Sequence, residues 1–330
     1  NSKYGFDSYE SNYSATKDLY KKLGNNYYVP YKAVAKNDTE TIVANVAITD
    51  SKIKPQDIVF KTKEGVAITK IDSTATSYTL QLKGIFDDAE IETQALVKQG
   101  TKYEVAGAFI QYQAAPKNIK VVVVNTSNTN IGTIKESLQN IYKQAMVNLT
   151  ITEINDFKND LEALTPNGTI QSGESGFAAQ YTEQQRQINN KLKQHPQYQQ
   201  DAYYLIVTDK TPSSANEKGL MPLGRQFGYI YTANAPPSGV GGLAAHELGH
   251  GAFQLKHPFS SQSYQYAQKA TNWLLDYKDG TKLPFVHWQT IHNPKLRVGV
   301  FDKDEEGQQV TVTDISELKE FANPDGSLTF

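Results

Sequence analysis

Between Tyr27 and Gln113 the chain consists of short runs in which apolar and polar residues partly alternate. Alternation with a period of two places successive side chains on opposite faces of a β-strand. Turn-forming residues, such as those at 36–39 and 63–65, separate these runs. Roughly six or seven short strands in about ninety residues predict an all-β sandwich of immunoglobulin-like type over residues 27–117. We expect residues 1–26 to be a separate N-terminal segment with one short helical stretch at most.

The pattern changes near Lys117, where continuous apolar runs replace the alternation. Residues 119–125 predict a buried strand, and the helical spacing of apolar residues within 131–147 predicts a helix after it. A second strand follows at 149–154, so this part begins with a strand–helix–strand unit. The sequence predicts a multidomain protein in which residues 118–330 form an α+β domain with a mixed sheet. Further elements of this domain are expected at 182–193 (helix), 202–209 (strand) and 226–232 (strand).

Residues 246–250 read His-Glu-Leu-Gly-His, after a loop rich in Pro and Gly. Positions i and i+4 of a helix share one face, so His246 and His250 can present two imidazoles to one metal ion. Glu247 lies beside them, where its carboxylate can reach a water molecule on the metal. Catalytic zinc takes three protein ligands and keeps a fourth position open, and His257 is the nearest candidate for the third ligand. The pattern predicts a zinc peptidase site in which Glu247 is the general base.

A continuing helix would place His257 too far from the other two histidines. Seven residues correspond to about 10 Å along a helix axis, whereas zinc–nitrogen bonds are about 2.0–2.1 Å long. The helix must therefore end soon after His250, and the chain must turn back. We expect Gly251 to provide a helix C-cap with positive φ, and Pro258 to prevent the helix from running on.

The sequence leaves other third ligands open. Asp276 is the first rival, because aspartate is a legitimate zinc ligand. His287 and His292 come next, although we favour packing or capping within a C-terminal helix for both. A thermolysin-type glutamate would have to be Glu305, the first Glu after His257, which stands in a charged run that we interpret as a solvated turn.

The HExxH segment resembles the metzincin clan of zinc metalloproteases, whose pattern is HExxHxxGxxH followed by a turn that contains Met. In this chain the third histidine stands one residue late, and Phe253 occupies the place of Gly. Residues 272–277 resemble the Met-turn, with Leu275 in place of Met, a change that conserves volume. The resemblance covers roughly residues 118–293 and implies a zincin catalytic domain with a bound zinc ion. It also implies that Tyr277 helps to stabilise the oxyanion.

A domain of this kind hydrolyses bonds in protein or peptide substrates. We expect the substrate to bind in extended form by strand addition, with the strand at 226–232 as the edge strand above the cleft. The alternative is a catalytically inactive zincin-fold module for binding or adhesion. Glu247 favours the enzyme, because a purely structural metal site has no use for this carboxylate.

Composition and charge exclude other classes of protein. A net charge of -2 and a pI of about 6.4 give no electrostatic case for binding nucleic acid or an anionic membrane. No stretch approaches the roughly 18 apolar residues that a membrane span requires. The absence of cysteine excludes disulfides and thiolate zinc ligands. The 20 tyrosines, and a polar start without Met or a signal peptide, lead us to expect a mature or excised segment of a secreted or cell-surface protein.

Overall fold

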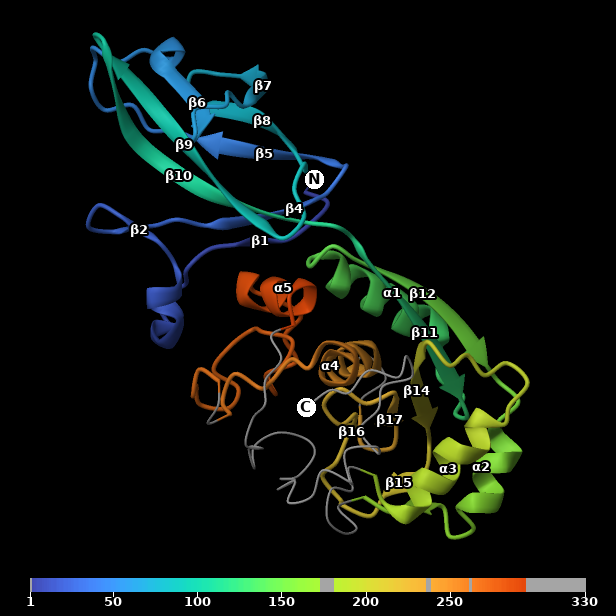
Figure 1. The fold of residues 1–330 in the computed structure, drawn as a ribbon. Helices are drawn as coiled ribbons and strands as arrows, with labels where there is room; N and C mark the ends of the chain where they lie inside the picture. Colours follow the sequence, from blue (N-terminus) through green and yellow to red (C-terminus); the bar gives the residue numbers. More distant parts are fainter. Residues whose placement is uncertain (1, 173–180, 236–238, 261–262, 295–330) are drawn as a thin grey trace, which may run out of the picture. The chain divides into compact units, whose positions relative to one another are not determined.

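The computed structural model describes residues 2–172, 181–235, 239–260 and 263–294. It contains an N-terminal β-rich region followed by a mixed α/β sheet region with helices (Figure 1). The chain divides into two compact units, which we describe separately. Within the described residues, the first unit comprises 2–117, 143–147 and 283–293, and the second comprises 118–142, the described part of 148–282, and residue 294. The segment and domain boundaries expected at 26 and 117 stay predictions.

The first unit contains two larger sheets and a separate two-stranded sheet of β2 and β3. The larger sheet has the strand order β1-β4-β10-β9-β6, in which the β4–β10 pair is parallel and the other pairs are antiparallel. The smaller sheet has the antiparallel order β5-β8-β7. Both sheets contribute side chains to one hydrophobic core, in which Phe60 and Val97 of the larger sheet lie with Tyr78 and Leu80 of the smaller. The elements are β1 (Phe6–Asp7), η1 (Ser14–Leu19), β2 (Lys22–Leu23), β3 (Tyr27–Tyr28), β4 (Tyr31–Ala35), β5 (Thr39–Asn45), η2 (Pro55–Asp57), β6 (Ile58–Thr62), β7 (Thr69–Ser73), β8 (Ser77–Lys83), β9 (Ala89–Gln99) and β10 (Lys102–Ala114).

A buried ion pair holds the first residues of the chain on this unit. Lys32 Nζ lies 2.9 Å from Glu40 Oε2, and the two side chains are 0% and 2% exposed. The ammonium group also donates to the Tyr4 carbonyl. The carboxylate accepts the backbone N–H groups of Lys3, Tyr4 and Thr41. Each charge is therefore surrounded by hydrogen-bond partners from the same unit, as a buried charge requires.

Helix α5 (Phe285–His292) belongs to the first unit, although it follows the second unit in the sequence. The backbone N–H of Phe285 donates to Asp7 Oδ2 at 2.9 Å, and the Phe285 ring stacks on Tyr31 with 3.8 Å between ring centroids. Near the other end of the helix, Lys117 Nζ donates to the Ile291 carbonyl at 3.0 Å. The helix is thus held at both ends by residues that precede the second unit. No hydrophobic pattern in the sequence predicts this return.

The second unit is built on a sheet with the strand order β12-β11-β14-β17-β16 (Figure 1). Strands β11, β14 and β17 are parallel, and β16 is antiparallel to β17. The strand–helix–strand start and the later helix and strands are confirmed. The elements are β11 (Lys117–Asn125), α1 (Ile131–Lys143), β12 (Val147–Ile154), α2 (Lys158–Leu164), β13 (Thr169–Ile170), α3 (Glu183–Lys193), β14 (Ala202–Thr208), β15 (Thr211–Pro212), β16 (Gly219–Leu220), β17 (Phe227–Tyr231) and α4 (Val240–Phe253).

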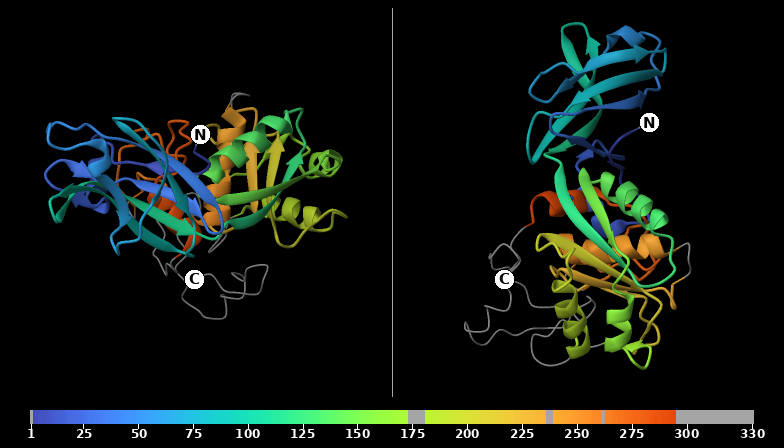
Figure 2. Two further views of the ribbon diagram at one scale, coloured as in Figure 1. Left: turned by 90° about the horizontal axis from the view of Figure 1, so that it is seen from above. Right: turned by 90° about the vertical axis from the view of Figure 1, so that its right-hand side faces the viewer.

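Helices cover both faces of this sheet. Val122 and Val124 of β11 point toward Leu161 of α2 and Ile188 of α3, within one core cluster. Helix α4 packs on β14, β16 and β17 and is joined to α1 by a hydrogen bond from the Tyr142 hydroxyl to its backbone. Figure 2 shows α1 and α4 on one side of the strands and α2 and α3 on the other. Among the described helices, none is both long and apolar enough to cross a membrane.

The prediction that the strand at 226–232 is an edge strand is wrong. The strand at 226–232 is β17, and it has a hydrogen-bonded neighbour on each side, β14 and β16. All five residues of β17 are buried, as expected for a strand inside a sheet that is covered on both faces. The edge next to it is β16, whose two residues are too few to give a periodic signal in the sequence.

Candidate metal centre

Helix α4 presents the two histidines of the HExxH segment from one face. It runs from Val240 to Phe253. Its residues are apolar or small, except for His246, Glu247 and His250 of the motif. Small residues allow it to lie close to its neighbours, since a methyl group on Gly241 would collide with Ser137 of α1. His246 and His250 lie one turn apart and are 7% and 0% exposed. The helix therefore delivers two imidazoles into the interior of the unit.

The turn after α4 is built at a different residue from the one we predicted. Gly251 lies inside the helix, packed against Met221, and it is Gln254 that takes the left-handed conformation, with φ 53° and ψ 31°. The backbone N–H groups of Gln254 and Leu255 donate back to the last turns of the helix, which ends it. Gln254 stands three residues before His257, the same interval as between Gly and the third histidine in the metzincin pattern.

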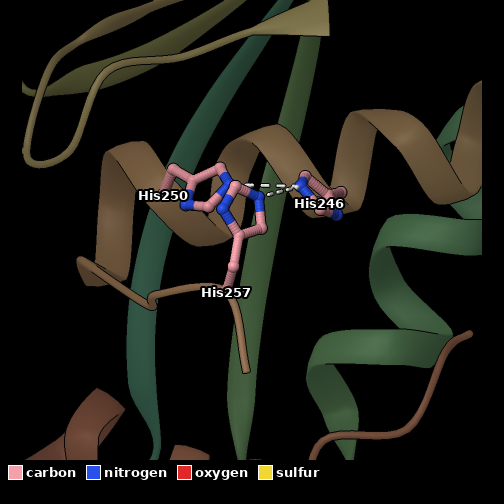
Figure 3. A group of neighbouring side chains, drawn as sticks. All are labelled: His246, His250 and His257. Carbon is pink, nitrogen blue, oxygen red and sulfur yellow. Dashed lines mark hydrogen bonds between the residues drawn. The ribbon is translucent and has the colours of Figure 1, made fainter. Parts of the chain in front are cut away.

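The turn brings His257 back to the other two histidines, so that three Nε2 atoms meet (Figure 3). The Nε2–Nε2 distances are 3.1 Å for His246–His250, 3.1 Å for His250–His257 and 3.2 Å for His246–His257. Three ligands of a tetrahedral zinc ion with bonds of 2.0–2.1 Å would lie about 3.3 Å apart. The observed triangle has nearly the size of one face of that tetrahedron.

The other ring nitrogens indicate which atoms carry the protons. His246 Nδ1 lies 2.9 Å from the Leu274 carbonyl, and His250 Nδ1 lies 2.7 Å from the Leu255 carbonyl. A carbonyl oxygen only accepts, so both Nδ1 atoms must donate. In the neutral ring the Nε2 atom then bears a lone pair, which points at the centre of the triangle. A hydrogen bond of this kind at the second nitrogen is the usual way in which proteins orient histidine ligands.

Burial keeps these rings neutral. It lowers the pKa of His246 to about 4, and burial together with the neighbouring histidines lowers the pKa of His250 well below its usual value. At neutral pH neither ring is protonated in the folded chain. Neutral imidazoles are the form that binds a metal ion, so the group of three could hold one.

The segment that resembles a Met-turn lies against this group. Leu275 is fully buried and lies within reach of Gly249, between the two histidines of α4. The Tyr277 ring lies 5.9 Å from the His246 ring and 5.0 Å from the His257 ring, centroid to centroid, and its side chain is 40% exposed. The tyrosine named from the sequence is therefore at the metal group and open to solvent.

Asp276 has a different place from that of a ligand. Its carboxylate accepts hydrogen bonds from the backbone N–H groups of Lys269, Thr271 and Tyr277, and from the Thr271 hydroxyl. It is not one of the three residues of the metal group. These bonds instead close the loop 269–277, which carries the Leu274 carbonyl toward His246.

Glu247 is buried beside the histidines and does not belong to their group. Its side chain is 1% exposed and lies against Gly219 of β16. Burial raises the pKa of Tyr142 well above its usual value, and the charge of Glu247 raises it further. The Glu247 carboxylate is thus close to β16, the edge strand of the sheet.

The remaining candidates lie elsewhere. His287 and His292 are on α5 in the first unit, where His292 Nε2 is 2.6 Å from the Ala145 carbonyl. This agrees with packing or capping rather than metal binding. Glu305 lies outside the described residues.

Some contributors to the centre were not predicted. Phe259 stacks on the His257 ring, with 4.7 Å between centroids and 9° between planes. The Leu255 and Leu274 carbonyls and Gly219 were also missed. A backbone carbonyl leaves no mark on the sequence, and a single aromatic or Gly residue gives no periodic signal.

A scan of the sequence against protein-family models finds no match, and a search of curated proteins finds none either.

Proposed function

We propose that this protein is a zinc-dependent endopeptidase with a metzincin-like catalytic domain. The observation that carries the proposal is the triangle of three buried Nε2 atoms, 3.1–3.2 Å apart, with Glu247 next to it in the sequence and on the same helix. Three histidine nitrogen ligands with a fourth position open are the ligand set of a catalytic zinc ion. A structural zinc site is normally closed by a fourth protein ligand.

The residues around the triangle support hydrolysis. Zinc, when bound there, would lower the pKa of a water molecule and polarise the scissile carbonyl. Glu247 accepts the proton of the attacking water and passes it to the leaving amine. Tyr277, which is partly exposed beside the histidines, donates a hydrogen bond from its hydroxyl to the developing oxyanion.

The folds of both units support the same family-level interpretation. The second unit has a mixed sheet with an antiparallel edge strand, and the histidine helix follows it in the chain, as in a zincin domain. In the first unit, the sheets that contain β4-β10-β9-β6 and β5-β8-β7 share one core, which supports an immunoglobulin-like sandwich. A protein or peptide substrate would bind extended along the edge formed by β16, and the protein would act outside the cell or at its surface.

The first test measures zinc and cleavage together. Purified wild type should contain about one zinc per chain, and His257→Ala should lose most of it. Glu247→Ala should keep the zinc but lose cleavage of a quenched fluorescent peptide library by a factor of about 10²–10⁴. His195→Ala, which removes a histidine of the same unit that is paired with Asp156, serves as the matched control and should keep both.

Two results would contradict the proposal. Wild type that takes up no zinc in chelator-free buffer would remove its basis. Zinc-loaded wild type that cleaves no peptide, with Glu247→Ala behaving identically, would favour the inactive binding or adhesion module. Zinc retained in His257→Ala would show that another residue provides the third ligand.

A further inference from the structure

The edge strand and the general base meet at one point. Gly219 of β16 pairs with Ile230 of β17 and is buried, although it stands at the edge of the sheet. What covers it is α4, which packs on β16 at this place. A Cβ atom built on Gly219 would lie 2.5 Å from Glu247 Oε1, 2.9 Å from its Cδ and 3.0 Å from its Cγ. The Glu247 carboxylate thus occupies the space that a side chain at position 219 would fill.

We propose that Gly219 is a positioning residue for Glu247: the missing side chain in the edge strand creates the space that aims the carboxylate at the attacking water. This inference rests on the proposed peptidase function. The three nearest atoms that a methyl group would meet all belong to the Glu247 side chain, not to the backbone. The fold can therefore admit the methyl group by moving this side chain, and the carboxylate with it.

Other glycines of the second unit show how specific this arrangement is. A Cβ atom on Gly251 would collide with Met221 and lie 2.7 Å from the Arg225 carbonyl, so that substitution strains the backbone. A Cβ atom on Gly242, in the first turn of α4, would have no atom of the described residues within 4 Å outside its own helix. Position 219 differs from both because its constraint falls on the one side chain that does the chemistry.

The variant Gly219→Ala tests the proposal, and Gly242→Ala is its matched control on the catalytic helix. Gly219→Ala should keep one zinc and a melting temperature within a few degrees of wild type. Its kcat should fall about 10²-fold, the effect of misplacing a catalytic group by about 1 Å, while KM changes little. Gly242→Ala should match wild type in zinc content, melting temperature, kcat and KM.

A double variant shows whether the effect passes through Glu247. Aspartate is one methylene shorter and leaves room for the added methyl group. Glu247→Asp should therefore cost much less kcat in the Gly219→Ala background than in wild type. If the two losses multiply, or if Gly219→Ala has wild-type kcat or loses its zinc, the proposal is wrong.

A binding measurement keeps this test separate from the test of the enzyme. Acetohydroxamic acid chelates zinc and gives its proton to an adjacent carboxylate, so its affinity reports the position of Glu247 without turnover. Affinity should fall similarly in Gly219→Ala and Glu247→Ala and stay unchanged in Gly242→Ala, even if wild type cleaves no peptide. Equal affinity in wild type and Gly219→Ala, with a loss in Glu247→Ala, would overturn the positioning role.

Discussion

The two units bury polar side chains in opposite ways. In the first, Lys32 and Glu40 carry opposite charges, meet at 2.9 Å and are surrounded by backbone partners. In the second, His246, His250 and His257 turn their three Nε2 atoms toward one point. The first arrangement satisfies itself and needs nothing from outside the chain. The second is complementary to a cation, so the comparison separates polar groups that hold a fold from polar groups that serve a ligand.

The largest effect is expected from breaking the ion pair. Lys32→Met leaves Glu40 as an uncompensated buried charge and should lower the free energy of unfolding by about 3–5 kcal/mol. Urea denaturation of wild type, the single variant and Lys32→Met with Glu40→Gln measures this. The double variant should recover much of the loss, and zinc content of the folded protein should stay at the wild-type level. Equal stability of wild type and Lys32→Met would show that the pair is dispensable.

His287 shows what burial alone does to the pKa of a histidine, because it lies outside the group of three histidines. It is a buried histidine of the first unit, and burial lowers its pKa to about 3. The unfolded chain, with a histidine pKa near 6.5, therefore binds more protons, so this group's stability contribution is lost as the pH falls from about 6.5 toward 3. Between pH 6 and 4 the loss should approach about 1.4 kcal/mol per pH unit.

The check is the slope of unfolding free energy against pH. His287→Gln should have a slope that is smaller than that of wild type by this amount, with zinc content unchanged. An identical slope would mean that the ring is already charged in the folded chain.

Asp276 should matter for zinc although it is not in the metal group. Asp276→Asn weakens the loop that brings the Leu274 carbonyl to His246, and loss of such an outer partner usually costs about 10–100-fold in metal affinity. Competition with a chelator of known affinity measures the change. Asp209→Asn, at an exposed position in the same unit, should have no effect. A complete loss of zinc in Asp276→Asn, with zinc kept in His257→Ala, would make Asp276 a ligand after all.

The smallest effect is expected at the end of α4. Gln254 takes a left-handed conformation that Gly adopts without steric cost, so Gln254→Gly should raise the free energy of unfolding by about 0.5–1 kcal/mol. Gly251→Ala should lower it, because the methyl group meets Met221 and the Arg225 carbonyl. Thermal unfolding of the two variants gives both signs. The opposite order would place the turn at Gly251, as the sequence first indicated.

What the sequence predicted correctly depends on local spacing. His246 and His250 share a face because they are four residues apart on one helix, and the strand–helix–strand start follows from runs of neighbouring residues. The left-handed residue was misplaced because Gly251 is the obvious candidate, while nothing local in the sequence marks Gln254 as the residue that ends the helix. The edge strand was misplaced for a related reason, since β16 is two residues long and pairing between strands is not local.

The first unit is assembled from three separate stretches of the chain, and its last helix, α5, follows the histidine helix α4 in the sequence. The unit is therefore a discontinuous domain, and no single continuous stretch of the gene encodes all of it. A chimera joined at a single junction near residue 117 would separate α5 from Asp7 and Tyr31, because the N-terminal half lacks the helix and the C-terminal half lacks the two residues. Insertion of a whole unit at paired junctions, rather than end-to-end fusion, is the exchange that this architecture tolerates.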